Sequence, residues 1–398
     1  RSRPLAYANQ WTASSSYLTP TLLLILSVSA SVVRIHGGGA AINYGRIADN
    51  LPTPAQVAPL LQSLNINRVK LYDADAGVLG AFANSSVEFV IALENNDLAK
   101  VSSNSGAALT WVSQNVRPHV PQTNITAINV GNEVFASNDS QLMANLVPAM
   151  RSIYGALTSL GLSKQVTVTT AHSLNVLAAS FPPSSGAFRS DLAQYIQPLL
   201  DFHAQIGSPF LINAYPFFAY KDSPGKVSLS YALFEPNAGT VDPVTKLKYD
   251  NMLYAQIDAV YSAIKRMGHA DIEVRVSETG WPSKGDSNEV GATPANAALY
   301  NGNLLNRLKK GEGTPARPSV SVDVHIFALF NEDQKSGPTS ERNYGLLFPD
   351  GRAVYNLQSQ TQGSSQGQGS LLEISASAPR MNVLISFWIV VAVLLVFS

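Results

Sequence analysis

The feature that most constrains the fold is a regular alternation of β-type and helical segments between residues 41 and 357. Eight short runs rich in β-branched and aromatic residues are separated by longer stretches with apolar residues at helical spacing. The runs cover residues 41–45, 67–73, 87–93, 125–133, 166–173, 209–218, 272–280 and 322–332. Eight strands separated by helices predict a single (β/α)8 TIM barrel, an α/β fold whose active site lies at the carboxyl ends of the strands.

Three of the helical stretches have recognisable ends. Residues 53–64 have Pro54 in the first turn, where a missing backbone N–H costs no helical hydrogen bond. Residues 139–160 form a second long stretch, and residues 249–267 form a third that stops at Gly268. These signals support helices between the predicted strands.

Two glutamates stand at the ends of two of these runs. Glu133 closes the fourth run, and Glu278 lies near the end of the seventh. An ionised carboxylate at the exit of a buried strand is costly unless it is needed there. In a barrel, both positions face the same opening, and hydrolysis of a glycosidic bond requires such a pair of carboxylates.

The charge balance limits the partners of this chain. Lys and Arg number 27, Asp and Glu also number 27, and no Lys/Arg run is present that could follow a phosphate backbone. We therefore expect no nucleic-acid partner. Charged residues make up only 14% of the chain and aromatic residues 9%, which suits a neutral, polar substrate such as a sugar.

Cysteine is absent, which excludes disulfides, zinc–thiolate sites and thiol nucleophiles. The histidines show no spacing typical of metal ligands, so we expect neither a metal nor another cofactor. The six histidines are His36, His119, His172, His203, His269 and His325.

Residues 1–36 are predicted to be a secretory signal region. Arg1 and Arg3 precede an apolar run over residues 18–33, and small residues around Ala30 fit a cleavage site. Residues 37–357 then form the catalytic barrel domain, outside the cell.

The other end of the chain predicts a lipid anchor. Residues 358–380 are a polar linker, and residues 381–398 are an apolar signal of the kind removed when glycosylphosphatidylinositol is attached. Ser375 is the first choice for the attachment site, with Gly367 or Gly369 as alternatives. A C-terminal membrane helix is the competing interpretation, which the shortness of the apolar run disfavours. We expect a protein anchored to the outer face of the plasma membrane, in the apoplast and cell wall.

Six short motifs together resemble one enzyme family. They are I-N-Y-G (42–45), R-V-K-L-Y-D-A-D (68–75), I-N-V-G-N-E (128–133), N-A-Y-P-F-F (213–218), V-S-E-T-G-W-P (276–282) and F-A-L-F-N-E-D-Q-K (327–335). In this order they resemble the plant glucan endo-1,3-β-glucosidases, glycoside hydrolase family 17. The resemblance implies a (β/α)8 barrel, a retaining mechanism and β-1,3-glucans such as callose as substrate. It assigns the general acid/base to Glu133 and the nucleophile to Glu278.

Further residues of these motifs are predicted to contact the substrate or support the carboxylates. Asn132 is placed to hydrogen-bond a sugar 2-hydroxyl, and Tyr215 to donate a hydrogen bond to the nucleophile. Glu332 and Lys335 match a glutamate and a lysine of the family motif, and we expect them to pair along the cleft. The aromatic residues expected to contact sugar, with burial in the core as the alternative, are Tyr44, Tyr72, Phe218 and Trp281.

Three N-x-[ST] sequons, at Asn84, Asn124 and Asn138, are candidate glycosylation sites, of which we expect at least one to be used. Many anchored members of the family have a cysteine-rich carbohydrate-binding module, which a chain without cysteine does not provide. We expect a monomer that binds β-1,3-glucan. A transglycosylase on the same barrel and a catalytically weak glucan-binding protein remain the alternative functions.

Overall fold

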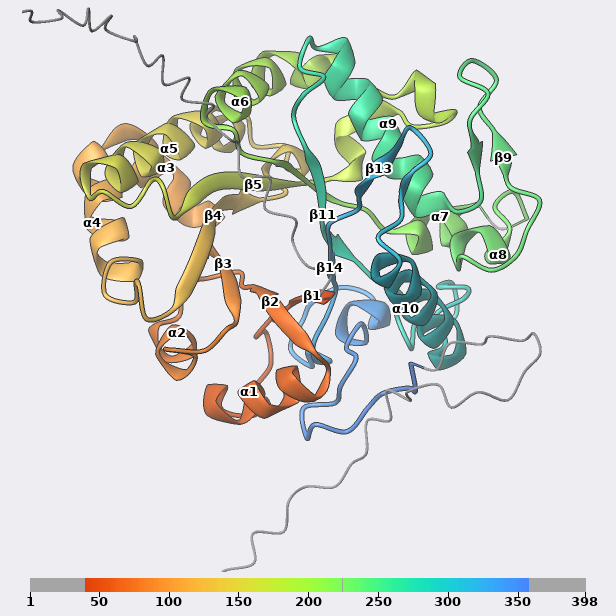
Figure 1. Ribbon diagram of the computed structural model, residues 1–398, viewed down its shortest axis with the longest axis horizontal. Helices are drawn as coiled ribbons and strands as arrows, with labels where there is room; N and C mark the ends of the chain where they lie inside the picture. Colours follow the sequence, from red (N-terminus) through yellow and green to blue (C-terminus); the bar gives the residue numbers. More distant parts are fainter. Residues whose placement is uncertain (1–39, 224, 358–398) are drawn as a thin grey trace, which may run out of the picture. The chain divides into compact units, whose positions relative to one another are not determined.

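The computed structural model describes residues 40–223 and 225–357, and within them eight parallel strands close into a barrel (Figure 1). The strands are β1 (Ala40–Asn43), β2 (Ile66–Lys70), β3 (Glu88–Leu93), β4 (Asn124–Asn132), β5 (Thr167–Ser173), β8 (Phe210–Asn213), β11 (Val274–Thr279) and β14 (Val324–Ile326). Neighbours follow chain order, and β14 pairs with β1 to close the barrel. The predicted (β/α)8 fold is confirmed, and every predicted run overlaps one of these strands.

Helices lie around the outside of the barrel (Figure 1). They are α1 (Pro54–Ser63), α2 (Ala76–Ala81), α3 (Leu98–Ser103), α4 (Ser105–Asn115), α5 (Ser140–Ser159), α6 (Ala193–Ile206), α9 (Met252–Arg266) and α10 (Pro294–Lys309). No helix in residues 40–223 and 225–357 is both long enough and apolar enough to cross a membrane.

Smaller elements are inserted between the barrel strands. They are the helices α7 (Pro216–Asp222) and α8 (Leu229–Ala232) and three two-stranded sheets, made by β6 (Leu177–Ala179) with β7 (Ala187–Phe188), β9 (Thr240–Val241) with β10 (Lys248–Tyr249), and β12 (Gly313–Thr314) with β13 (Arg317–Ser321). Short 3₁₀ helices cover Asn95–Asp97, Val134–Ala136, Leu174–Val176, Pro183–Ser185, Ser190–Leu192 and Thr339–Arg342.

The predicted helix ends agree closely with the structure, and one start differs. Thr53 caps α1 in a capping box with Gln56, and Asp139 caps α5 by accepting from two backbone N–H groups. Helix α9 begins at Met252 rather than at residue 249, because Tyr249 pairs in the β9–β10 sheet.

The sixth and eighth strands end earlier than predicted. β8 stops at Asn213, and Pro216 begins helix α7. Proline has no N–H for a sheet ladder, but its fixed φ suits the first turn of a helix. β14 likewise stops at Ile326. Several predicted site residues therefore lie on the loops just after the strands.

The core combines an apolar shell with a polar barrel interior. Aliphatic and aromatic side chains are packed between the strands and the surrounding helices. Inside the barrel, however, Asn43, Lys70, Asn129 and Asn213 are almost completely buried. Buried polar groups are costly unless they are hydrogen-bonded, and Asn43 Nδ2 donates to the backbone oxygens of two strands. This polar interior lies beneath the residues predicted to be catalytic.

Candidate active site

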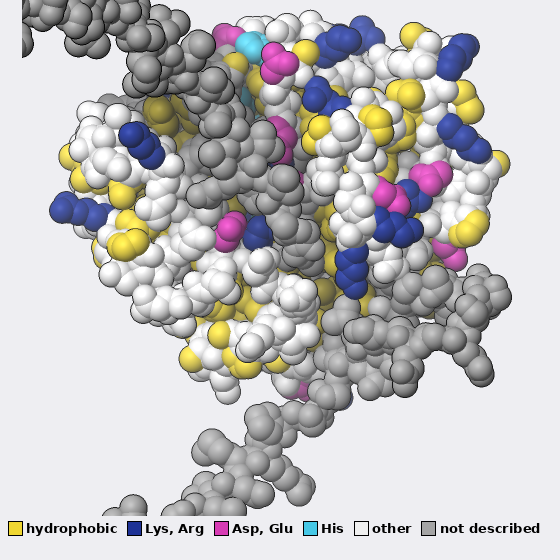
Figure 2. All heavy atoms as spheres, viewed as in Figure 1, with side chains coloured by type: hydrophobic (Ala, Val, Ile, Leu, Met, Phe, Trp, Pro, Cys, Tyr) yellow, Lys and Arg dark blue, Asp and Glu magenta, His cyan; other side chains and the backbone are white. Residues whose placement is uncertain are grey.

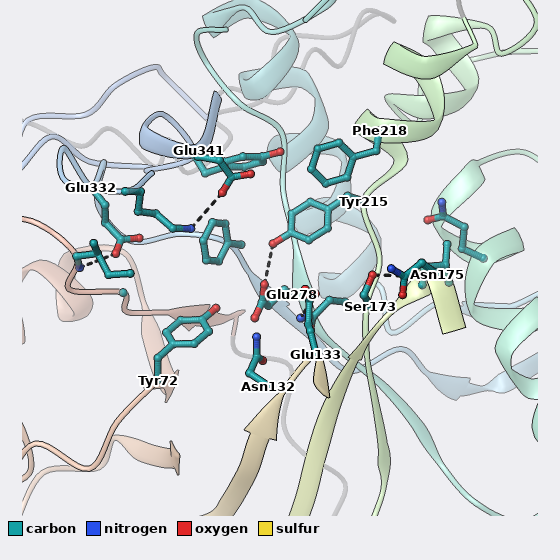
Figure 3. A pocket seen from close by; sticks show the side chains of 18 of the residues that line it. Tyr72, Asn132, Glu133, Ser173, Asn175, Tyr215, Phe218, Glu278, Glu332 and Glu341 are labelled. Atoms are coloured by element: carbon teal, nitrogen blue, oxygen red, sulfur yellow. Dashed lines mark hydrogen bonds and ion pairs between the residues drawn. The ribbon is translucent and has the colours of Figure 1, made fainter. Parts of the chain in front are cut away.

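A cavity of about 600 Å³ opens at the carboxyl ends of the barrel strands (Figure 3). It is lined by side chains from several strand ends and the loops that follow them. Its lining residues are Gly45, Arg46, Ile47, Tyr72, Asn132, Glu133, Ser173, Leu174, Asn175, Asn213, Tyr215, Phe218, Ala219, Gln256, Glu278, Phe327, Glu332, Lys335, Glu341 and Tyr344. Both predicted catalytic glutamates are among them.

The backbone at the end of β4 turns sharply and directs Glu133 into this cavity. Gly131 and Glu133 have φ values of 67° and 52°, and the pairing of β4 with β5 shifts register before Asn132. A Cβ at Gly131 would lie 2.8 Å from Val134 Cγ2, so only glycine fits there. Glu133 is in a left-handed conformation that is uncommon for a residue with a side chain, and such strain clusters at functional sites.

Asn95 holds the same turn from the side. Its Oδ1 accepts from Asn132 N at 2.8 Å, and its Nδ2 donates to Asn132 O at 3.0 Å. The side chain therefore replaces the ladder hydrogen bonds that the strand loses at this point. The position of Asn132 in the cavity is set by these two bonds.

The surroundings of Glu133 favour its protonated form. Burial raises the pKa of Glu133, and the negative charge of Glu278 raises that pKa further. Asn213 Nδ2 donates to Glu133 Oε1 at 2.8 Å, which opposes part of this shift. Ser277 donates its hydroxyl to Asn213 Oδ1, so the amide N–H of Asn213 faces Glu133.

Both oxygens of Glu278 accept a hydrogen bond. Lys70 Nζ lies 3.0 Å from Oε1, and the Tyr215 hydroxyl donates to Oε2 at 2.9 Å (Figure 3). Burial and the charge of Glu278 raise the pKa of Tyr215 well above its usual value, so this hydroxyl keeps the proton it donates. The predicted bond from Tyr215 to Glu278 is confirmed. Glu278 therefore has a cation and a hydroxyl donor on its two oxygens, whereas the raised pKa of Glu133 favours the acid form of that group.

The sequence analysis missed Lys70, whose side chain has no exposed surface. The sequence did contain a signal for this residue, because Lys70 is a basic residue inside a predicted β-strand. A charge that is buried in a strand needs a partner of opposite charge.

Replacing Lys70 with methionine is expected to lower the free energy of unfolding by about 3–5 kcal/mol, because the buried Glu278 carboxylate loses its cation. The double variant Lys70→Met/Glu278→Gln is expected to recover most of this loss. Urea denaturation monitored by circular dichroism measures both. Lys310→Met, which changes a lysine whose side chain is 70% exposed, is the matched control. If Lys70→Met and Lys70→Met/Glu278→Gln were destabilised equally, Lys70 and Glu278 would not be energetically coupled.

Most of the other predicted contact residues line the same cavity. Tyr72, Asn132 and Phe218 point into it (Figure 3), and Phe218 is 37% exposed. Glu332 and Lys335 also line it. An exposed aromatic ring beside buried carboxylates is a surface on which a sugar ring can stack.

The predicted pairing of Glu332 with Lys335 is wrong. Lys335 Nζ instead pairs with Glu341 Oε2 at 3.3 Å and lies over the Phe327 ring. Glu332 accepts from the backbone N–H of Ile47 at 2.9 Å, and burial raises its pKa. The Glu332 carboxylate is thus bonded to the amide of Ile47, and the lysine pairs with a carboxylate six residues further along the chain.

The prediction that Tyr44 and Trp281 contact sugar is also wrong. Their exposed fractions are 2% and 0%, and neither lines the cavity. The Tyr44 ring packs edge-on against Phe330, and the Trp281 indole N–H donates to Gly291 O. A position just after a strand does not reveal on which side the ring lies, because the alternation of side chains ends with the strand ladder.

Besides Lys70, the structure brings in residues that the sequence analysis did not single out. They are Ser173, Asn175, Asn213, Gln256, Phe327, Glu341 and Tyr344. Asn213 could have been found, because it stands at a strand end as the two glutamates do. The loop and helix residues Glu341, Tyr344 and Gln256 have no comparable signal in the sequence.

The sequons differ in accessibility. Asn84 and Asn138 are exposed, whereas Asn124, the first residue of β4, is half-buried. The predicted attachment residue Ser375, the signal region 1–36, the linker 358–380 and the apolar segment 381–398 lie outside the described residues. Among residues 40–223 and 225–357, no group of three or more His, Asp or Glu is arranged to hold a metal ion.

Comparison with known proteins agrees with the fold. The family model described as "Glycosyl hydrolases family 17" matches residues 40–359. The chain belongs to this family of glycoside hydrolases, whose members include retaining glucan endo-1,3-β-glucosidases.

Two relatives and two solved structures illustrate the similarity. "Glucan endo-1,3-beta-glucosidase 14" of Arabidopsis thaliana is 62% identical over 343 residues, covering 86% of this chain and 87% of the relative. "Glucan endo-1,3-beta-glucosidase 11" of the same plant is 52% identical over 345 residues, covering 86% of this chain and 81% of the relative. The structure of CJP38, a β-1,3-glucanase and allergen of Cryptomeria japonica pollen, has a TM-score of 0.77 at 40% identity and covers 80% of this chain and 98% of that one. The structure of a plant β-glucan endohydrolase has a TM-score of 0.74 at 35% identity, and the match covers 80% of this chain and 99% of that one.

Proposed function

We propose that this chain cuts (1→3)-β-D-glucosidic linkages within β-1,3-glucans such as callose, with retention of anomeric configuration. The observation that supports this most is the division of roles between two carboxylates in one cavity. Burial and a neighbouring charge raise the pKa of Glu133, whereas Glu278 accepts hydrogen bonds from Lys70 and Tyr215 on its two oxygens. Such a pair is what retaining hydrolysis needs, and the names of the relatives supply the linkage.

In the first step, Glu278 attacks the anomeric carbon while Glu133 gives its proton to the departing glycosidic oxygen. The bond from that carbon to the oxygen breaks, and an ester between the sugar and Glu278 forms. Lys70 and Tyr215, which hydrogen-bond the two oxygens of Glu278, position this carboxylate for the attack.

In the second step, the deprotonated Glu133 takes a proton from water, which displaces Glu278 and restores the original configuration. Asn132 lies beside both glutamates in the cavity (Figure 3), and we expect its amide to hydrogen-bond a sugar 2-hydroxyl. This contact strengthens as the oxocarbenium-like transition state develops. Tyr72 and Phe218 supply aromatic surface for neighbouring glucosyl residues.

Product analysis with laminari-oligosaccharides tests this function. We expect internal cleavage into shorter oligosaccharides, with the β-anomer of the new reducing end appearing first in proton NMR spectra. The α-anomer appearing first would contradict retention. Products longer than the substrate would identify transglycosylation, and no products together with tight binding would identify a glucan-binding protein.

On the face that Figure 2 shows, the charges of the described part are mixed, which suits a neutral substrate. Figure 2 shows Lys and Arg side chains in separate groups, several of them beside Asp and Glu. We expect the enzyme to act as a monomer, since both catalytic glutamates come from one chain. The exposed Asn84 and Asn138 are the first candidates for glycan attachment, ahead of Asn124.

The apolar segment 381–398 is part of this proposal, as the signal for a lipid anchor on the outer face of the plasma membrane. Phosphatidylinositol-specific phospholipase C is expected to release active enzyme from plasma membranes into the aqueous phase. Mass spectrometry of the released protein is expected to find the anchor remnant on Ser375. Retention in the membrane, with peptides from residues 383–398 in the mature protein, would indicate a transmembrane segment instead.

A further inference from the structure

A second cavity, which we call the side cavity, adjoins the active-site cavity. It has a volume of about 610 Å³, within the range of roughly 300–1,000 Å³ that is typical of small-molecule sites. Ala219 on α7 and Gln256 on α9 line both cavities, so the two meet at these residues. The other residues that line it are Ser180, Phe181, Lys226, Val227, Ser228, Tyr231, Asn237, Ala238, Gly239, Thr240, Met252 and Ala255.

Gln256 has an unused hydrogen-bonding group at this junction. Only 8% of the residue is exposed, and its Oε1 has no hydrogen-bond partner. A buried amide oxygen without a donor is unfavourable. When the side-chain amide of Gln256 turns toward the cavity, this oxygen can accept a hydrogen bond from a ligand hydroxyl. Its neighbours on the same face of α9 are apolar, so nothing in the fold itself requires a polar side chain there.

The lining of the side cavity has the chemistry of a carbohydrate site. Phe181 is 69% exposed at its edge, and the half-buried Tyr231 offers a second ring. Ser228, Asn237 and Thr240 are polar and uncharged, and Lys226 is the single charged residue of the lining. Aromatic faces with neutral hydrogen-bonding groups suit a sugar better than an anion or an apolar ligand.

The wall formed by Asn237 to Thr240 is held in place. Asn237 bonds to the backbone of Glu235, Gly239 and Asp250. Asp242 accepts from the backbone N–H and the hydroxyl of Ser184, which ties the β9–β10 sheet to the loop that follows Phe181. A site formed in advance in this way does not have to be ordered when a ligand binds.

We propose that the side cavity binds glucosyl residues distant from the bond that is cut, with Gln256 Oε1 accepting a sugar hydroxyl. The residues come either from the continuing β-1,3-linked chain or from a 6-linked glucosyl branch on it. This inference rests on the proposed function, because the ligand is part of the same glucan that occupies the active-site cavity.

Two substitutions test the proposal by different routes. Gln256→Leu removes the acceptor at nearly constant volume, and Ala238→Trp places a large ring in the side cavity from an exposed loop position. Gln62→Leu, the same chemical change on the exposed side of α1, is the matched control. kcat/KM is measured on linear oligosaccharides from laminaritriose to laminariheptaose and on a heptaose with a 6-linked glucosyl branch.

We expect both variants to lose about tenfold in kcat/KM on the substrates that reach the side cavity and much less on laminaritriose. A loss that grows with linear chain length assigns the site to the main chain, and a loss confined to the branched heptaose assigns it to the branch. An equal loss on every substrate, or no loss on any, would overturn the proposal.

Binding separates this proposal from the proposed function. Calorimetry with laminariheptaose is carried out on the Glu133→Gln protein and on Glu133→Gln/Gln256→Leu, neither of which has to turn over. We expect the second protein to bind about tenfold more weakly. Failure of the wild type to cleave any oligosaccharide would contradict the proposed function alone, whereas identical affinities of these two proteins would contradict the side-cavity site alone.

Discussion

Replacing Glu278 with alanine is expected to reduce hydrolysis of β-1,3-glucan by on the order of 10⁴-fold or more, because the group that forms the covalent intermediate is lost. Azide is expected to restore turnover and to yield an α-glucosyl azide. The small anion fits the space left by the carboxylate and attacks the anomeric carbon from the same side, while Glu133 still protonates the leaving oxygen. The rate is followed by reducing-sugar release, and the azide product by NMR spectroscopy.

A matched variant controls for the loss of a negative charge. Glu273 is exposed and lies just before β11, at the end of the strand opposite to Glu278. Glu273→Ala is expected to keep wild-type activity and to show no response to azide. Rescue of Glu278→Ala that gave the β-glucosyl azide would reverse the roles assigned to the two glutamates.

Replacing Glu133 with glutamine is expected to slow hydrolysis of natural glucan by on the order of 10²–10⁴-fold. The loss is expected to be much smaller on an aryl β-glucoside with an acidic phenol, because that leaving group departs without a proton. Comparing kcat/KM on the two substrates measures the contribution of the acid. If both substrates lost the same factor, Glu133 would not be the proton donor.

The pH dependence of the wild type follows from the same carboxyl group. Burial and the charge of Glu278 raise the pKa of Glu133, so the acid form persists above the usual range of glutamate. As the pH rises through this pKa, the donor loses its proton and kcat/KM falls. In Glu133→Gln this alkaline limb is expected to disappear, since glutamine does not titrate. An unchanged alkaline limb would assign it to another group.

The sequence was sufficient for the barrel and for the two glutamates, because both follow from local patterns. Each strand is marked by β-branched residues and each helix by apolar spacing, and the barrel brings all carboxyl strand ends to one opening. Glu133 and Glu278 could therefore be placed in one cavity without any knowledge of contacts between them. The bond from Tyr215 to Glu278 was also predicted, because the family motif locates Tyr215 at that opening.

Only the tertiary structure decided which side chains meet. Lys70 and Glu278 are 208 residues apart in the sequence, and their pairing depends on the register of strands across the barrel. Beyond a strand end no ladder dictates side-chain direction, so Tyr44 and Trp281 turn into the core and Lys335 pairs with Glu341. Gln256 belongs to a helix whose pattern indicates only that one face is buried, and nothing local shows that this face borders two cavities. The spacing of apolar residues along a helix or strand shows which of its sides is buried. A site depends on contacts between individual side chains of different helices, strands and loops, and these contacts are determined by how the elements pack.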